Sequence, residues 1–419
     1  MHEEPFFTND AIVLGLLCLV LAFVFVTSSS KKSGWQTFYK FVPPLLLCYF
    51  LPALLTWPLG LIDGESSNLY NPVTSRYLLP ASLILLCLSI DLKGIIGLGP
   101  KALIMFFTAT LGIVIGGPIA LLLISWVAPG IIDTGGEPLW AGLSTVAGSW
   151  IGGGANQAAM KEIYEVSDSL FGSMLVVDIV VANIWMGFLL YGASISKRVD
   201  GWLKADSSAI DDLKNRVESY SASISRNPTT TDYFQILAVA FGGTALSHWL
   251  SDMITPLFAK HEEYLTEIGL SSLTSGFFWL IVLATTFGVA MSFTKARKLE
   301  GAGASKIGSV FIYLLVASIG MKMNLGEVFN NLDAFAIGIV WMLIHVGLLL
   351  LVAKLIKAPF FFVAVGSQAN VGGAASAPVV ASAFSPALAP VGVLLAVLGY
   401  ALGTYGAIIC AELMQVVSP

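Results

Sequence analysis

AGSWIGGGANQAAM, residues 147–160, is the stretch on which the fold of this chain depends. It lies in an uncharged segment between Glu137 and Lys161 that is long and apolar enough to cross a membrane. Three consecutive glycines and an amide pair are nevertheless poor helix formers. Irregular backbone is tolerated at membrane depth only when it is buried in protein or lines a water-filled cavity. The stretch therefore predicts a membrane helix that is interrupted at a binding site.

A similar stretch, VGSQANVGGAASAP, occurs at residues 365–378. Interrupted membrane helices at corresponding places in two halves of a chain are typical of the midplane binding site of secondary transporters. The alternative is that the small residues only allow neighbouring helices to pack closely. We favour the binding site because amides as well as glycines recur at both stretches.

The composition indicates an integral membrane protein. Of 419 residues, 56% are hydrophobic and 11% are charged, against about 25% charged in soluble domains. The net charge of −5 is spread thinly, without a basic stripe, so we expect no nucleic-acid partner. The four cysteines lie in apolar segments and indicate buried small side chains, not disulfides or metal ligands. The first apolar run follows acidic residues, so we expect a retained helix and not a cleaved signal peptide.

Continuous apolar runs predict an all-α polytopic membrane protein, because a membrane barrel would show alternating segments of about ten residues. The predicted helices span 11–27, 40–58, 76–92, 102–127, 138–160, 169–195, 234–258, 272–293, 304–322, 333–355, 359–384 and 388–414. We divide the chain into a first membrane repeat (1–195), a polar linker (196–233) and a second membrane repeat (234–419).

The two halves repeat the order apolar helix, apolar helix, broken helix, closing helix. Residues 147–160 correspond to 365–378, and Asp91 corresponds to Asn324. We therefore expect two repeats of about six helices, each with one broken helix. Internal repeats of this kind are typical of secondary carriers.

Basic residues indicate the orientation of membrane segments. In the first half they gather after the first and third predicted helices, and in the second half after the eighth and tenth. If all twelve segments cross, these loops lie on opposite sides. Either one segment does not cross, with 234–258 the first candidate, or a crossing has not been recognised. The bias favours inverted over parallel repeats, both of which occur in carriers.

Asp178 is the deepest carboxylate, midway along the helix 169–195 that follows the first interruption. An acid within the membrane is costly without compensation, which makes it a functional candidate. It could ligate a cation or carry a proton, and the alternative is a cap on backbone amides freed nearby. Asn183 lies about 140° further around the helix, so it would face another side of the same cavity.

Neutral oxygens and half-helix ends at the interruptions suit a weakly held cation beside a carboxylate-bearing solute. The predicted cation-binding residues are Asn156, Gln157, Asp178, Asn183, Gln368 and Asn370. The predicted substrate-binding residues are Ser149, Gly153, Gly154, Ala155, Asn156, Gly372, Gly373 and Ser376. We expect no cofactor, except Na⁺ as a coupling ion near Asp178, Asn156 and Gln368. His345, in mid-span, either makes an interhelical hydrogen bond or carries a proton.

Other function classes lack support in the sequence. It contains no Ser/His/Asp spacing, no His-Glu-x-x-His, no phosphate-binding lysine motif and no metal cluster. We therefore expect no enzyme. A channel is a further class, which the duplicated interruptions disfavour.

The paired stretches, with Asp178 after the first, resemble over nearly the whole chain a bacterial and plastid membrane family catalogued as domain of unknown function 819. That family is similar to the superfamily of monovalent cation/proton antiporters and sodium-coupled bile-acid-type symporters. The resemblance implies a core domain with two crossed, discontinuous helices and a separate panel domain. It also implies inverted repeats, elevator-like movement and a homodimer.

Within this superfamily, electrogenic antiporters carry paired acids, or Asn then Asp, on the helix after the first break. The symporters instead use Asn, Gln, Ser and backbone oxygens at the helix crossing. In this chain that helix has the single Asp178 and a distant Asn183, and the two interruptions have many neutral groups. We therefore expect a secondary transporter of a bacterial inner membrane that couples Na⁺ or H⁺ to symport of a small, anionic organic solute. The alternative is a monovalent cation/proton antiporter.

Overall fold

The computed structural model describes residues 5–418, except 43, 63, 65–66, 89–91, 130–135, 206–209, 211–226, 268–270, 323–333 and 386–387. These residues form helices, and the β contact found among them is an isolated bridge between Phe7 and Ile62. The predicted all-α polytopic class is confirmed. Asp91 and Asn324, which were used to align the two halves, lie outside the described residues.

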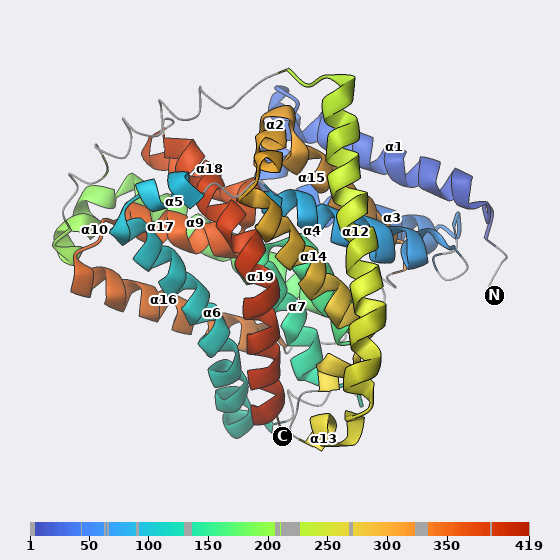
Figure 1. Cartoon of the computed structure of the whole chain (residues 1–419). Helices are drawn as coiled ribbons and strands as arrows, with labels where there is room; N and C mark the ends of the chain where they lie inside the picture. The colour runs from blue at the N-terminus through green and yellow to red at the C-terminus, as the bar shows by residue number, and fades with distance from the viewer. Residues whose placement is uncertain are drawn as a thin grey trace.

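The first half of the chain contains both long helices and short segments (Figure 1). They are α1 (Asp10–Ser28), α2 (Ser33–Phe41), α3 (Pro44–Thr56), η1 (Leu69–Leu78), α4 (Leu79–Leu88), α5 (Leu92–Gly97), α6 (Pro100–Val127), α7 (Leu139–Gly152), α8 (Gly154–Ile163) and α9 (Asp168–Ser194). At the start of α9, Ser167 accepts a hydrogen bond from the backbone N–H of Leu170, which satisfies a donor left free by the helix end.

The second half begins after α10 (Ser196–Leu203), which occupies the start of the predicted linker. Its helices are α12 (Thr230–Ala259), α13 (Glu262–Glu267), η3 (Ser271–Thr274), α14 (Gly276–Ser292), η4 (Lys295–Ala302), α15 (Ala304–Gly320), α16 (Ala334–Ile356), α17 (Phe360–Val371), α18 (Gly373–Phe384) and α19 (Ala389–Val417). Thr229 and Asp232 form a capping box that fixes the start of α12.

Among the described residues, five helices are long and apolar enough to cross a membrane, or six if the bent pair α14 and η4 counts as one. The five are Asp10–Ser28, Pro100–Val127, Asp168–Ser194, Ala334–Ile356 and Val391–Val417. The other predicted segments form shorter, interrupted or more polar helices. Both predicted interruptions lie where the chain leaves helical geometry.

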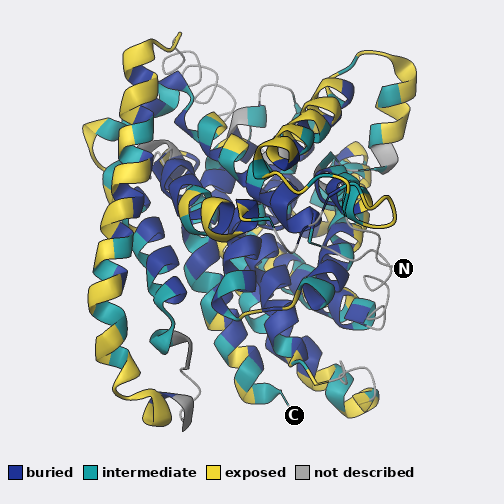
Figure 2. Ribbon diagram, turned by 90° about the vertical axis from the view of Figure 1, so that its right-hand side faces the viewer, coloured by how far each residue is buried: buried dark blue, intermediate teal, exposed yellow. Residues whose placement is uncertain are grey.

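The helices pack as two sets, and in Figure 1 the first lies at the left and centre, with α19 and α7 next to the second. In the first set, α6 packs along α16, and α7, α17 and α18 pack along α19, with α8 and α9 beside them. In the second set, α4 packs against α12, α14 and α15, and α15 against η1, α3 and α1. The sets meet where α4 and α14 contact α8 and α19, and where α15 contacts α8. Buried residues gather in the centre and exposed ones along the outer helices (Figure 2).

The first interrupted helix folds back on itself at Gly153, which has φ of +75°. Residues eight apart in a straight helix are separated by about 12 Å along its axis. A Cβ added at Gly148 would nevertheless lie only 2.6 Å from the carbonyl oxygen of Asn156. Helix α8 therefore runs back against α7, so the predicted single crossing 138–160 is corrected to a helix pair joined by a sharp turn.

The second interrupted helix also bends sharply, between Gly372 and Gly373. The Gln368 amide donates to the Ser376 hydroxyl at 2.7 Å, although the two residues are eight positions apart. Helices α17 and α18 pack against each other. The single crossing predicted for 359–384 is therefore corrected in the same way.

Two contacts between loop ends limit which combinations of the twelve predicted segments can cross the membrane. Lys101 donates to the Lys357 carbonyl at 3.2 Å, and Lys322 lies 3.1 Å from Asp168, so the residues of each pair lie on one side. If all twelve segments crossed, Lys101 and Lys357 would lie on opposite sides. If 234–258 alone did not cross, Lys322 and Asp168 would be separated. Both contacts are compatible with an α7–α8 pair whose two ends lie on the same side of the membrane. That 234–258 does not cross stays a prediction, and α12 is not among the described helices that are long and apolar enough to cross a membrane.

Candidate binding site at the two helix interruptions

Asp178 joins α9 to both halves of the first interrupted helix. Its carboxylate accepts hydrogen bonds from Ser149 Oγ and Trp150 Nε1 of α7, both at 2.7 Å, and from Gln157 Nε2 of α8 at 3.0 Å. The side chain is 3% exposed. Three donors compensate part of the cost of burying a carboxylate, and they hold the two half-helices at fixed positions around it.

Two buried amide oxygens at the interruptions have no hydrogen-bond partner among the residues that the structure describes. They are Oε1 of Gln157 and Oε1 of Gln368. In each side chain the amide nitrogen is engaged, by Asp178 in one case and by Ser376 in the other. An unsatisfied buried acceptor costs about 1–3 kcal/mol, and an oxygen of this kind is a ligand suited to a hard cation.

The two asparagines at the interruptions have both ends of their amides engaged. Asn156 donates to the Gly152 carbonyl at 2.9 Å and accepts from Thr404 of α19 at 2.6 Å. Asn370 makes the same kinds of contact with two other residues, the Gly366 carbonyl at 3.0 Å and the Thr110 hydroxyl at 2.8 Å. These hydrogen bonds make each asparagine a brace for the backbone beside its interruption.

His345 takes part in a chain of hydrogen bonds across four helices, α6, α16, α17 and α9. Its Nδ1 lies 3.1 Å from the Ala109 carbonyl, which can only accept, so Nδ1 carries the proton. Its Nε2 then accepts from the Ser367 hydroxyl at 2.8 Å. Ser367 in turn accepts from Trp185 Nε1, also at 2.8 Å. Of the two predicted roles for His345, the geometry supports the interhelical hydrogen bond.

The two interruptions converge on Gly399 of α19. A Cβ added at Gly399 would lie 3.0 Å from the Ile151 carbonyl oxygen and 3.2 Å from the Ala369 carbonyl oxygen. One point on α19 therefore contacts the backbone next to both interruptions. This places the two predicted half-sites beside each other, although they are far apart in the sequence.

Several predicted residues lie away from these contacts. Asn183 donates to the Ile179 carbonyl of its own helix at 2.7 Å, so it does not contact Asp178. Space is open around Gly154 and Gly373, because a Cβ added at either would have no neighbour within 4 Å. Ala155 is buried at the first turn of α8.

Among the residues that contact the interruptions and that sequence reasoning missed are Trp150, Trp185, Thr110, Thr404 and Gly399. Single threonines, tryptophans and glycines are common in membrane helices and carry no signal of their own. Trp150 alone lies within a predicted stretch, and its partner Asp178 could have drawn attention to its indole N–H.

The site suits a monovalent cation better than a transition metal. Within the described residues, no three His, Cys, Asp or Glu side chains converge. The available groups are one carboxylate and neutral oxygens, which are hard ligands. The site could therefore hold an ion such as Na⁺ but offers no soft ligands.

The fold and these two interruptions define a polytopic helical membrane protein with a paired, buried polar centre. Residues 15–417 match the family described as "Protein of unknown function (DUF819)", and the chain belongs to this family. A relative in Bacillus subtilis (strain 168), the "Uncharacterized membrane protein YjcL", is 24% identical over 358 residues, which cover 84% of this chain and 85% of the relative.

Proposed function

We propose that this protein is a secondary active transporter that couples Na⁺ or H⁺ to the symport of a small, anionic organic solute. The observation that carries the proposal is the Asp178 carboxylate, which is buried between both halves of an interrupted helix. A membrane protein keeps such a costly group where a charged ligand or a proton compensates it.

The cation in this proposal binds between Asp178 and the free oxygen of Gln157. The carboxylate supplies the charge, and the amide oxygen gains the partner that it lacks in this structure. Asn156 and Asn370 then act as braces, and the free oxygen of Gln368 is the counterpart at the second interruption. This revises the roles that the sequence suggested for the two asparagines.

The solute in this proposal binds where the two interruptions meet at Gly399. The N-terminal ends of α8 and α18 begin at the breaks and carry a partial positive charge. Such ends favour a carboxylate. Movement of the first helix set against the second would expose the site alternately on the two sides of a bacterial inner membrane. We retain the expectation of a homodimer.

The cation site can be tested before the solute is known. We expect NaCl, compared with choline chloride at equal ionic strength, to raise the melting temperature of the purified protein, because a ligand bound only by the folded state stabilises it. Asp178→Asn should abolish this shift. Asp252→Asn, at an exposed position on α12, is the matched control and should keep it. An equal Na⁺ effect in Asp178→Asn would contradict the site.

Flux measurements in proteoliposomes can distinguish symport from antiport. Uptake of ²²Na⁺ that depends on an added organic acid, and that Asp178→Asn abolishes, supports symport. Proton flux driven by Na⁺ or K⁺ alone, without organic solute, supports the cation/proton antiporter. The buried Asp178 carboxylate is compatible with either, because it can exchange a cation for a proton.

A further inference from the structure

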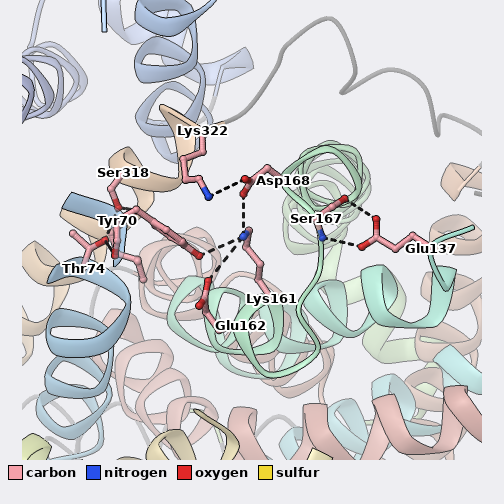
Figure 3. A network of polar contacts seen from close by, with 10 residues as sticks. Tyr70, Thr74, Glu137, Lys161, Glu162, Ser167, Asp168, Ser318 and Lys322 are labelled. Atoms are coloured by element: carbon pink, nitrogen blue, oxygen red, sulfur yellow. Dashed lines mark hydrogen bonds and ion pairs between the residues drawn. The ribbon is translucent and has the colours of Figure 1, made fainter. Parts of the chain in front are cut away.

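A cluster of charged and aromatic side chains lies at one place where the two helix sets meet (Figure 3). The Asp168 carboxylate, at the start of α9, lies 3.0 Å from Lys161 Nζ and 3.1 Å from Lys322 Nζ. Lys161 Nζ also donates to the Tyr70 hydroxyl at 3.3 Å and lies 3.9 Å from Glu162. Both ammonium groups face the Tyr70 ring, at 5.2 and 4.8 Å from its centroid, a favourable cation–π arrangement.

The members of this cluster come from both helix sets. Lys161, Glu162 and Asp168 belong to α8 and α9 of the first set. Tyr70 lies in η1, and Lys322 follows α15, both in the second set. The Lys322–Asp168 ion pair and the Lys161–Tyr70 hydrogen bond therefore connect the two sets directly.

The Lys322–Asp168 ion pair can break without leaving the Asp168 carboxylate unpaired, because Lys161 also pairs with it. The side chains of Lys161, Lys322 and Asp168 are 7%, 19% and 22% exposed. Removing the partner of a buried charge is strongly unfavourable. When Lys322 moves away with the second set, however, Lys161 stays beside Asp168 within the first set. Lys322 is the more exposed lysine and reaches water more readily.

We propose that Asp168, Lys322, Lys161 and Tyr70 form a latch that holds the two helix sets in the conformation of this structure and opens when the sets move. Lys161 is the resident partner of Asp168, and Lys322 is the removable one. This inference rests on the proposed function, because the movement is the one that alternating access requires.

Two of the native cysteines can report the movement separately from general loosening. Cys87 of α4 is 0% exposed and packs against Val397 and Ala401 of α19, across the boundary between the sets. Cys410 of α19 is 0% exposed and contacts the Ile113 carbonyl of α6, within the first set. Movement between the sets should uncover Cys87 and leave Cys410 covered, and a buried thiol does not react.

The experiment measures N-ethylmaleimide labelling of full-length protein that retains either Cys87 or Cys410 as its one cysteine. We expect Asp168→Asn and Lys322→Gln each to accelerate labelling of Cys87 about fivefold or more, because loss of one link of this kind shifts an equilibrium by about that factor. Labelling of Cys410 should stay unchanged. Lys322→Arg, which keeps the charge, should stay close to the wild-type rate.

Glu137→Gln is the matched control. Glu137 accepts hydrogen bonds from the backbone N–H and hydroxyl of Ser167, directly before Asp168, so this variant disturbs the start of α9 without touching the latch. Wild-type labelling of Cys87 in this control, with acceleration in the two latch variants, supports the proposal. Unchanged Cys87 labelling in the latch variants overturns it, as does acceleration in the control or a parallel rise at Cys410. No cation or solute is present, so the outcome is independent of the ²²Na⁺ test.

Discussion

At the scale of single residues, two carboxyl groups near α8 differ in their partners. Asp178 accepts three hydrogen bonds, whereas Glu162, beyond the predicted span 138–160, has Lys161 at 3.9 Å. Burial raises the pKa of Glu162 from 4.5 to about 7, although the nearby Lys322 ammonium partly opposes this rise. Glu162 therefore keeps its proton in the folded state to a higher pH than in the unfolded chain.

Glu162 should make stability depend on pH. Between about pH 4.5 and pH 7 the unfolded chain has released this proton and the folded protein has not, so stability falls as pH rises and then levels off. Glu162→Gln cannot ionise. Its melting temperature relative to wild type should therefore be higher at about pH 8 than at about pH 5. Glu262→Gln, an exposed substitution on α13, should show no such trend, and an equal trend in both variants would contradict the assignment.

At the scale of elements, the first interruption depends on the backbone of one residue. Gly153 ends α7 and precedes α8 with φ of +75°, a conformation that other residues adopt only with strain. Its neighbour Gly154 lies inside the first turn of α8, with open space around it. The two adjacent glycines therefore have different roles, one in the turn and one in a helix.

Alanine substitutions should separate these roles. We expect Gly153→Ala to destabilise the protein by about 1–3 kcal/mol, because φ of +75° with ψ of −174° is a backbone conformation that essentially only glycine adopts. Gly154→Ala should be neutral or stabilising by up to about 1 kcal/mol, since alanine is the better helix former. Thermal unfolding of both variants in one detergent makes the comparison. Equal losses at both positions would mean that the turn does not depend on Gly153.

At the scale of the whole molecule, the fold-back of α7–α8 changes how the two halves sit in the membrane. If this pair enters and leaves the membrane on the same side, five of the six predicted segments in the first half cross the membrane. The second half then starts on the opposite side, which is the arrangement of inverted repeats. In that arrangement the basic loops after α5 and after α16, and the basic segment η4 itself, all face the cytoplasm. This is the side that the positive-inside rule requires.

This topology predicts which lysine positions share a side. In a cysteine-free background, Lys101→Cys and Lys357→Cys should both resist a membrane-impermeant maleimide added to intact cells. Lys260→Cys, after α12, should react because its loop faces outward. All three should react after the membrane is permeabilised. Labelling of only one of the Lys101 and Lys357 positions would contradict the fold-back of α7–α8.

The sequence by itself determined the membrane class, the two places where a helix must stop and the presence of an acid, Asp178, deep in the helix that follows the first of them. These properties are local: they follow from apolar composition, from glycine beside amides and from one acid at membrane depth. The same reasoning placed Asn183 near the site, although it bonds to its own helix. It also treated Asn156 and Asn370 as ligands, although their amides are engaged by protein groups.

The tertiary structure alone decided that the interrupted helices fold back and that both converge on Gly399. It likewise decided that Trp150 bonds to Asp178 and Thr404 to Asn156. It also decided that Lys322 pairs with Asp168. The physical reason is that each of these contacts joins residues that are distant along the chain or separated by a turn. The angle of a turn and the helix against which it packs depend on the surrounding side chains, and local residue patterns do not encode them.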